Sequence, residues 1–224
     1  GVELGVAESH CFWREVLSEE ARHKLIVGAA AVPTTASLFN SFYETSTASD
    51  PLDGLLEIDR RMFLPDDLMV KNDRMTMAHS LEARVPFTDI ELARELVSWP
   101  TSLKMSGLTG KQLLRRGMQG RLPSRILSKK KVGLEMPYSR WLTDEWKEWS
   151  GDLLLSESAA AGGLLDPAAI RSIWEQHQSH RVDHGRALWG LMNFLTWHDL
   201  YLGSGDPSSH MPEVRPARCQ EASS

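Results

Sequence analysis

The chain has 224 residues, 42% of them hydrophobic and 25% charged, which is typical of one large globular domain or two small ones. No apolar run approaches the roughly 18 residues of a membrane-spanning helix, and the N-terminus lacks a signal-peptide pattern. Cys11 and Cys219 lie near opposite ends, which disfavours a structural disulfide and favours a reducing compartment, the cytoplasm. The first residue is Gly1 rather than methionine, so we expect an excerpt of a longer protein or a processed product.

The net charge of −5 conceals an uneven distribution. Residues 96–134 contain nine basic residues and no acidic one: Lys104, Lys111, Arg115, Arg116, Arg121, Arg125, Lys129, Lys130 and Lys131. All 30 acidic residues lie elsewhere, with 16 basic ones, so the rest of the chain carries a charge of −14. This basic segment predicts an anionic partner, such as phosphate, a nucleotide or a nucleic-acid backbone, with a solvated basic face as the alternative.

In chain order, helical periodicity predicts a first helix over residues 12–31, ended by Val32 and Pro33. Thr34 or Thr35 is expected to cap a second helix. Pro51 is expected to open a third helix, whose apolar residues reach Phe63 at the helical period.

The stretch 64–89 is expected to begin a further helix at Pro65, because two acidic residues follow it in the first turn, and to end it at Pro86. Beyond its first turn, this helix combines apolar residues with six titratable ones, which are Lys71, Asp73, Arg74, His79, Glu82 and Arg84. A largely buried helix with so many charges needs partners for them, so composition favours a core helix held by salt bridges.

Downstream, Asp89 is expected to cap a helix over residues 90–98, with Leu92, Leu96 and Val97 facing inward. A helix from Thr109 or Gly110 to Gly120 and a short one over 124–127 follow, whereas residues 128–137 fit no helical pattern.

The last third predicts three aromatic anchors and two helices. Trp141, Trp146 and Trp149 are expected to pack in a core or against a neighbouring domain rather than bind a ligand. Asp166 and Pro167 begin a helix that ends near residue 178, and residues 183–202 form a final helix that is apolar around most of its surface and therefore buried. Residues 204–224 are expected to be a disordered tail.

No alternation of apolar and polar residues predicts a sheet, so the expected fold is mainly α. The sequence contains no glycine-rich phosphate loop and no nucleophile elbow. His177, His180 and His184 straddle a helix end with irregular spacing, which disfavours a metal site.

Two segments together resemble the synthetase domain of glutamine-hydrolysing asparagine synthetases. Residues 72–89 read Asn-Asp-Arg-Met-Thr-Met-Ala-His-Ser-Leu-Glu-Ala-Arg-Val-Pro-Phe-Thr-Asp, close to the family signature Asp-Arg-Met-Ser-Met-Ala-x-x-Leu-Glu-x-Arg-x-Pro-Phe-Leu-Asp. About forty residues later, residues 129–137 resemble its Arg-x-Lys-x-Gly-Phe-x-x-Pro element. The segments 99–104 and 111–115 and the closing tryptophans also fit. Thr88, Lys129 and Leu134 depart from the pattern, replacing Leu, Arg and Phe.

The resemblance implies that residues 1–203 are the helical C-terminal portion of an α/β nucleotide-binding domain of the PP-loop, adenine nucleotide α-hydrolase-like type. Its parallel sheet would lie mostly upstream, because the family's Ser-Gly-Gly-x-Asp-Ser loop and its Gly-Glu-Gly-x-Asp-Glu element are not in this chain. The N-terminal glutaminase cysteine is missing too. The sites for ATP and Mg²⁺ are therefore expected mostly upstream, with no metal site in this chain.

The resemblance also implies a reaction. The family activates the side-chain carboxylate of aspartate at the α-phosphate of ATP, forming a β-aspartyl-adenylate and pyrophosphate, and ammonia from glutamine then displaces AMP. Lys131 matches the catalytic lysine, which stabilises developing phosphate charge, with a register error onto Lys129 left open. It lies on a loop anchored by Gly133 and Pro137.

Four further residues are expected to support the signature helix through salt bridges rather than to touch substrate: Asp73, Arg74, Glu82 and Arg84. The expected partners are aspartate, ATP, glutamine or ammonia, and the upstream synthetase and glutaminase segments, and a homodimer is compatible with them. The chain alone is expected to be inactive.

Two alternatives remain. A related enzyme could adenylate another carboxylate, in β-lactam, lasso-peptide or sugar and peptide amidation. From a different class, a basic helical module could bind nucleic acid, but the basic segment has no interleaved aromatics, which disfavours this reading.

Overall fold

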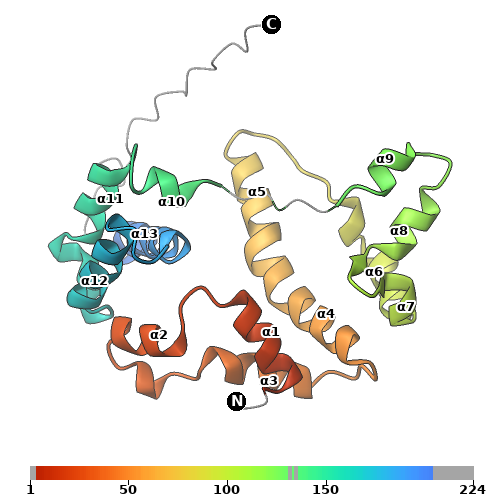
Figure 1. Cartoon of the computed structure of the whole chain (residues 1–224), viewed down its shortest axis with the longest axis horizontal. Helices are drawn as coiled ribbons and strands as arrows, with labels where there is room; N and C mark the ends of the chain where they lie inside the picture. Colours follow the sequence, from red (N-terminus) through yellow and green to blue (C-terminus); the bar gives the residue numbers. More distant parts are fainter. Residues whose placement is uncertain (1–3, 131–132, 134–135, 204–224) are drawn as a thin grey trace, which may run out of the picture. The chain divides into compact units, whose positions relative to one another are not determined.

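The computed structural model describes residues 4–130, 133 and 136–203, and these are mainly helical, as predicted (Figure 1). They form two compact units along the chain. Unit 1 consists of Gly1–Arg14 with Pro33–Leu134, and unit 2 of Glu15–Val32 with Glu135–Ser224. The tail expected at 204–224 lies outside the described residues. Within the described part, no helix combines the length and apolarity needed to cross a membrane.

Unit 1 contains short helices and one β-hairpin. Its elements are α1 (Val6–Arg14), α3 (Thr35–Glu44), α4 (Pro51–Arg61), the π-helical η2 (Leu64–Met69), α5 (Val70–Met77), η3 (Pro86–Thr88), α6 (Ile90–Val97), α7 (Thr101–Lys104), β1 (Met105–Ser106), β2 (Thr109–Gly110), α8 (Gln112–Gly117) and α9 (Ser124–Leu127).

The core of unit 1 lies where α1, α3 and α4 meet. Its buried residues are Ala7, Cys11, Phe39 and Ile58. The cap predicted for α3 forms, since the side chain of Thr34 accepts a hydrogen bond from Ser37 N. Helix α4 begins at Pro51 as predicted, and the side chain of Asp50, which the sequence did not single out, accepts a hydrogen bond from Leu52 N. These caps satisfy amides that a helix leaves unpaired at its start, so both helices begin where the sequence predicts.

The stretch 64–89 does not form the single buried helix expected from Pro65 to Pro86. Instead α4, η2 and α5 follow one another as a long helical rod (Figure 1), which ends at Met77. Ser80 follows with φ of 58°, and residues 81–85 are neither helix nor strand. Met75 and Met77 are 61% and 55% exposed, so the expected core helix is wrong for the described chain. Helical periodicity continued past Met77, but a residue with positive φ cannot continue an α-helix.

Beyond this stretch, Asp89 caps α6 as predicted, its side chain accepting from Leu92 N at 2.9 Å. The inward face expected for α6 is wrong, because Leu92 and Val97 are 39% and 50% exposed. The sequence also missed the antiparallel hairpin of β1 and β2, since strands of two residues are too short to show alternation. The short helix α9 spans the predicted residues 124–127.

Unit 2 is built from α2 (Glu19–Leu25), η1 (Ala29–Ala31), α10 (Tyr138–Trp141), α11 (Lys147–Leu154), η4 (Glu157–Gly163), α12 (Pro167–Gln178) and α13 (Gly185–Leu202). The single helix predicted over residues 12–31 is wrong. The chain leaves α1 at Arg14, and α2 begins after Ser18, whose side chain accepts from Ala21 N at 3.2 Å. A serine followed by two glutamates is a helix-start signal that overrides the apolar period here.

The core of unit 2 is larger, with Leu142, Leu154, Ile170 and Leu188 almost completely buried. As predicted, Asp166 caps α12, accepting from Ala168 N at 2.7 Å, and the helix ends at Gln178.

The N-terminal half of α13 is buried as predicted, whereas its C-terminal turns expose Leu200 and Tyr201. The three tryptophans expected to pack in a core or against a neighbouring domain are partly buried, and Trp149 packs against the core of unit 2. The ring centroid of Trp146 lies 4.6 Å from that of Trp141 and 5.9 Å from that of Trp149.

Candidate functional site

The signature residues lie on the surface of unit 1. Asp73 and Arg74 belong to α5 and are exposed, and neither side chain has an ion-pair partner among the described residues. Glu82 and Arg84 follow α5 and form an ion pair of 2.5 Å, but their side chains are 69% and 85% exposed. Exposed pairs of this kind contribute about 0–1 kcal/mol, so within this chain the four residues do not hold the rod in a core.

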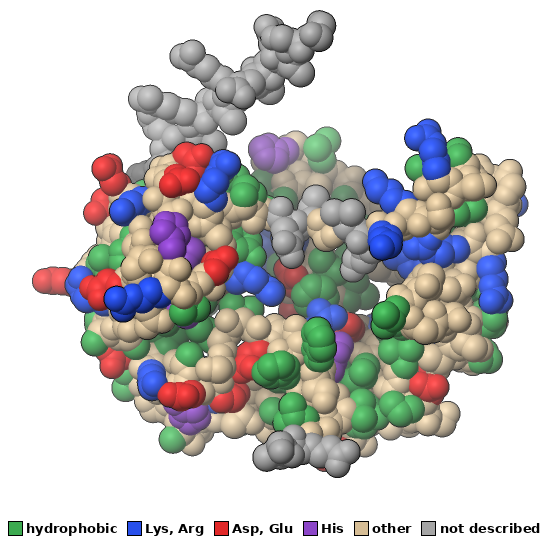
Figure 2. All heavy atoms as spheres, viewed as in Figure 1, with side chains coloured by type: hydrophobic (Ala, Val, Ile, Leu, Met, Phe, Trp, Pro, Cys, Tyr) green, Lys and Arg blue, Asp and Glu red, His purple; other side chains and the backbone are tan. Residues whose placement is uncertain are grey.

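The basic segment divides into bound and exposed cations. Lys104 and Arg115 are partly buried and hydrogen-bonded, as described below. The exposed ones, for which the described part of the chain offers no ionic partner, are Lys111, Arg116, Arg121, Arg125, Lys129 and Lys130. Figure 2 shows Lys and Arg side chains gathered over the part of unit 1 that Figure 1 labels α8 and α9. This face is therefore positively charged and open to an anion.

The structure describes only some residues of the predicted catalytic loop. Lys131, predicted as the catalytic residue, lies outside the described residues. Lys129 and Gly133 are described and exposed, and neither belongs to a helix or strand. The loop begins where α9 ends, at Leu127, so α9 and its contacts determine where Lys129 lies.

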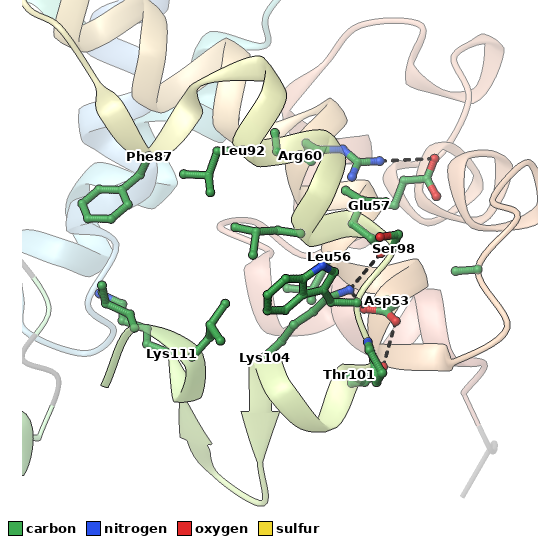
Figure 3. Close-up of a pocket in the computed structure, with 18 of the residues that line it drawn as sticks. Asp53, Leu56, Glu57, Arg60, Phe87, Leu92, Ser98, Thr101, Lys104 and Lys111 are labelled. Atoms are coloured by element: carbon green, nitrogen blue, oxygen red, sulfur yellow. Dashed lines mark hydrogen bonds and ion pairs between the residues drawn. The ribbon is translucent and has the colours of Figure 1, made fainter. Parts of the chain in front are cut away.

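A cavity of about 1270 Å³ lies within unit 1, between α4, α6, α7 and α8 (Figure 3). Leu92, Leu96 and Val97 line it, which explains why the apolar face of α6 is exposed. Figure 3 shows Phe87 and Lys111 at one side of this space and the pair of Asp53 and Lys104 at the other.

Asp53 and Lys104 form a partly buried ion pair in this cavity. Lys104 Nζ lies 2.7 Å from Asp53 Oδ1 and donates to the Val97 carbonyl at 3.1 Å, while Thr101 Oγ1 donates to Asp53 Oδ2 at 2.8 Å. Partial burial alone would raise the pKa of the Asp53 carboxyl, but the hydrogen bonds from Lys104 and Thr101 and the lysine charge outweigh it and lower that pKa. The pair ties α4 to α7.

Sequence analysis did not single out Asp53. Lys104 belongs to the basic segment and to the family-like segment 99–104, but neither pattern predicts an ion pair for it. The sequence does place an aspartate in the first turn of an amphipathic helix. Its favourable interaction with the helix dipole explains such an aspartate without any ion pair. Its partner lies 51 residues away, and no local pattern reveals such a pairing.

Of the three histidines considered as metal ligands, His177 and His184 are hydrogen-bonded within unit 2. His177 is 4% exposed, its Nε2 lies 3.1 Å from the Ser139 carbonyl, and its Nδ1 accepts from His184 N at 3.2 Å. Burial, followed by the charge of His177, lowers the pKa of His184. Among the described residues, no three His, Cys, Asp or Glu side chains are grouped to hold a metal ion.

These features define a helical protein with a cationic surface segment. Sequence comparisons identify it further: the sequence model of the asparagine synthase family matches residues 6–199, so the chain belongs to the asparagine synthase family. No solved structure matches the chain.

Among curated proteins, the chain is similar to putative glutamine-hydrolysing asparagine synthetases of Mycobacterium bovis and Mycobacterium tuberculosis, each 35% identical over 161 residues, which are 71% of this chain and 24% of the relative. It is 30% identical to asparagine synthetase 1 of Bacillus subtilis over 172 residues, 77% of this chain and 26% of that protein. The chain thus spans about a quarter of the length of these relatives.

Proposed function

We propose that the chain is part of an ATP-dependent amidotransferase of asparagine biosynthesis, which converts aspartate to asparagine through a β-aspartyl-adenylate with ammonia from glutamine. The family match over residues 6–199 carries this proposal, together with relatives that are named as glutamine-hydrolysing asparagine synthetases. The acid-free basic segment supports it independently, because six of its cations are exposed and lack an ionic partner in the described chain.

Within this function, Lys131 is the residue that we propose to stabilise the negative charge that develops on the phosphates. A positioned donor of this kind typically contributes about 10²–10³-fold in rate. Lys129 adds positive charge beside it, and Gly133 and Pro137 anchor the loop. The assignment of Lys131 rests on the motif at 129–137.

The remainder of the enzyme is proposed to lie upstream. Residues 1–203 then form the helical C-terminal part of a PP-loop synthetase domain, whose parallel sheet would hold ATP. The residues described here do not fit a Mg²⁺ site, since none of their carboxylates and histidines form a group of three. We place the Mg²⁺ ligands and the glutaminase upstream as well, and regard a cytoplasmic homodimer as compatible with this arrangement.

The signature residues gain a role in this arrangement. Asp73, Arg74, Glu82 and Arg84 are proposed to pair with the upstream sheet rather than with substrate. Their exposure in this chain supports the proposal, because charged side chains near exposed Met75 mark a surface that a further segment can cover.

A direct test is aspartate-dependent exchange between pyrophosphate and ATP by the complete protein, which joins this chain to its upstream segment. We expect exchange with aspartate and, on adding glutamine, release of asparagine and AMP. Exchange with another carboxylate but not with aspartate would instead identify a related amide-forming enzyme. Absence of exchange with any carboxylate would contradict adenylation itself.

The chain alone is expected to be inactive and to bind ATP weakly or not at all, because the loop that would hold the phosphates is not in its sequence. Calorimetric titration of the 224-residue chain with ATP checks this expectation. Tight binding by the isolated chain would show that its basic segment suffices as a nucleotide site.

A further inference from the structure

Arg115 of α8 makes an unusual set of contacts for a residue in a basic surface segment. Its Nε donates to the Gly110 carbonyl at 3.2 Å, one terminal nitrogen donates to the Leu127 carbonyl, and the other donates to the Lys129 carbonyl at 3.4 Å. The three acceptors belong to the end of β2, the last residue of α9 and the first turn beyond α9. The guanidinium thus connects the β1–β2 hairpin to the start of the loop that carries Lys129.

These bonds satisfy groups that a short helix leaves open. The last carbonyls of any helix have no partner within it, and α9 has a single turn. In the described part of the chain, no backbone amide donates to the Leu127 or Lys129 carbonyl. A guanidinium presents several N–H donors in one rigid plane and can reach three carbonyls at once, whereas an ammonium group has three donors on one nitrogen.

The neighbouring residue supplies a natural contrast. Arg116 carries the same charge on the same helix, yet it is exposed, and its side chain has no hydrogen-bond or ionic partner among the described residues. Arg115, in contrast, is partly buried and donates to three carbonyls. The difference between the two arginines is therefore one of geometry and not of charge.

We propose that Arg115 is a positioning residue, which fixes the segment from Leu127 to Lys129 against the hairpin and so determines where the loop 128–137 leaves α9. Its consequence for catalysis rests on the proposed function, because only there does the loop carry the catalytic lysine. The hydrogen bonds themselves do not depend on that function.

The first measurement is limited trypsin digestion of the complete protein, with cleavage sites identified by mass spectrometry. Arg115→Ala is expected to accelerate cleavage after residues 129–131 over other sites, because the segment loses its attachment. Arg116→Ala is the matched control and is expected to cleave at the wild-type rate. Arg115→Lys keeps the charge but loses the planar guanidinium, so its cleavage rate is expected to lie between those of Arg115→Ala and Arg116→Ala. Unchanged cleavage in Arg115→Ala, or acceleration spread over all sites with a lower unfolding midpoint, would overturn the proposal.

The second measurement is aspartate-dependent pyrophosphate exchange by the same variants. Displacing a reacting group by about 1 Å can cost about 10²-fold in rate, so Arg115→Ala is expected to lower kcat by up to that factor with little change in KM for ATP. The control for activity is Arg171→Ala, which removes an exposed arginine of α12 outside the basic segment and is expected to retain wild-type kcat. If Arg115→Ala accelerates cleavage after residues 129–131 but leaves kcat unchanged, the proposed effect of Arg115 on catalysis is overturned. If the wild-type protein shows no exchange, the proposed function fails, and the digestion pattern still decides whether Arg115 holds the segment.

Discussion

At the scale of single residues, the ion pair of Asp53 and Lys104 connects α4 to α7 within unit 1. The basic segment and its lack of acids are evident from composition, but one of its lysines is neutralised by an aspartate in a helix far upstream. Ion pairs at this depth contribute more than surface pairs, because both groups also donate or accept further hydrogen bonds.

The pair predicts a pH-dependent stability. Asp53→Asn is expected to lower the free energy of unfolding by about 1–2 kcal/mol near pH 7. Because the pKa of Asp53 is lowered in the folded state, its contribution is present above the unfolded pKa of about 3.9 and is lost as pH falls through the folded value. The free energies of unfolding of the wild-type protein and Asp53→Asn, measured in urea between pH 7 and pH 3, should therefore approach each other as the pH falls. Asp144→Asn, at an exposed aspartate, is the control. A difference in free energy of unfolding between wild type and Asp53→Asn that stays constant from pH 7 to pH 3 would contradict the stabilising role of the ion pair.

Arg74 gives a second prediction at this scale. In the isolated chain its side chain is exposed, so Arg74→Ala is expected to change the free energy of unfolding by less than about 0.5 kcal/mol. In the complete protein the same change is expected to reduce stability and activity together, because the upstream segment would supply its partner. Thermal unfolding of both forms and exchange assays of the complete protein measure this. Lost activity in a fully stable complete protein would indicate direct contact with substrate.

At the scale of elements, local signals predicted helix starts better than helix ends. The predicted caps Thr34, Asp89 and Asp166 each precede a periodic segment, and the side chain of each accepts a hydrogen bond from a backbone amide. Two features that the sequence did not predict, the end of α5 and the β-hairpin, leave no such local signal. The end of α5 at Met77 precedes a residue with positive φ, and the hairpin of β1 and β2 has too few residues for a pattern.

Two glycines test the packing of helices. Gly54 in α4 faces Tyr43, and a Cβ there would lie 2.7 Å from its ring, whereas a Cβ at Gly190 in α13 would meet nothing within 4 Å. Alanine is favoured over glycine in a helix by about 1 kcal/mol. Gly190→Ala is therefore expected to raise the free energy of unfolding, and Gly54→Ala to lower it despite the same propensity gain. Chemical denaturation compares them, and stabilisation by both would show that α3 and α4 are not in contact as described.

At the scale of the whole chain, the sequence predicted a helical protein and its family, but not its division into two units. Residues 15–32 belong to unit 2 because Ile26 bridges to Leu165 and Val27 N donates to the Leu164 carbonyl at 2.9 Å. Backbone pairing across so many residues leaves no local trace. The candidate site shows the same limit: the motif at 129–137 predicts a role for Lys131, whereas the segment 111–115 resembles the family without indicating what Arg115 binds, and only its contacts show that.

Lys131 is the residue to which the proposed function assigns the stabilisation of phosphate charge. The direct test is aspartate-dependent exchange of pyrophosphate into ATP by the complete protein carrying Lys131→Ala, with Lys130→Ala and Lys129→Ala as neighbours of equal charge. We predict a loss of about 10²–10³-fold for Lys131→Ala and much smaller changes for the other two. An unchanged exchange rate in Lys131→Ala, or the large loss appearing at Lys129 instead, would contradict the assignment.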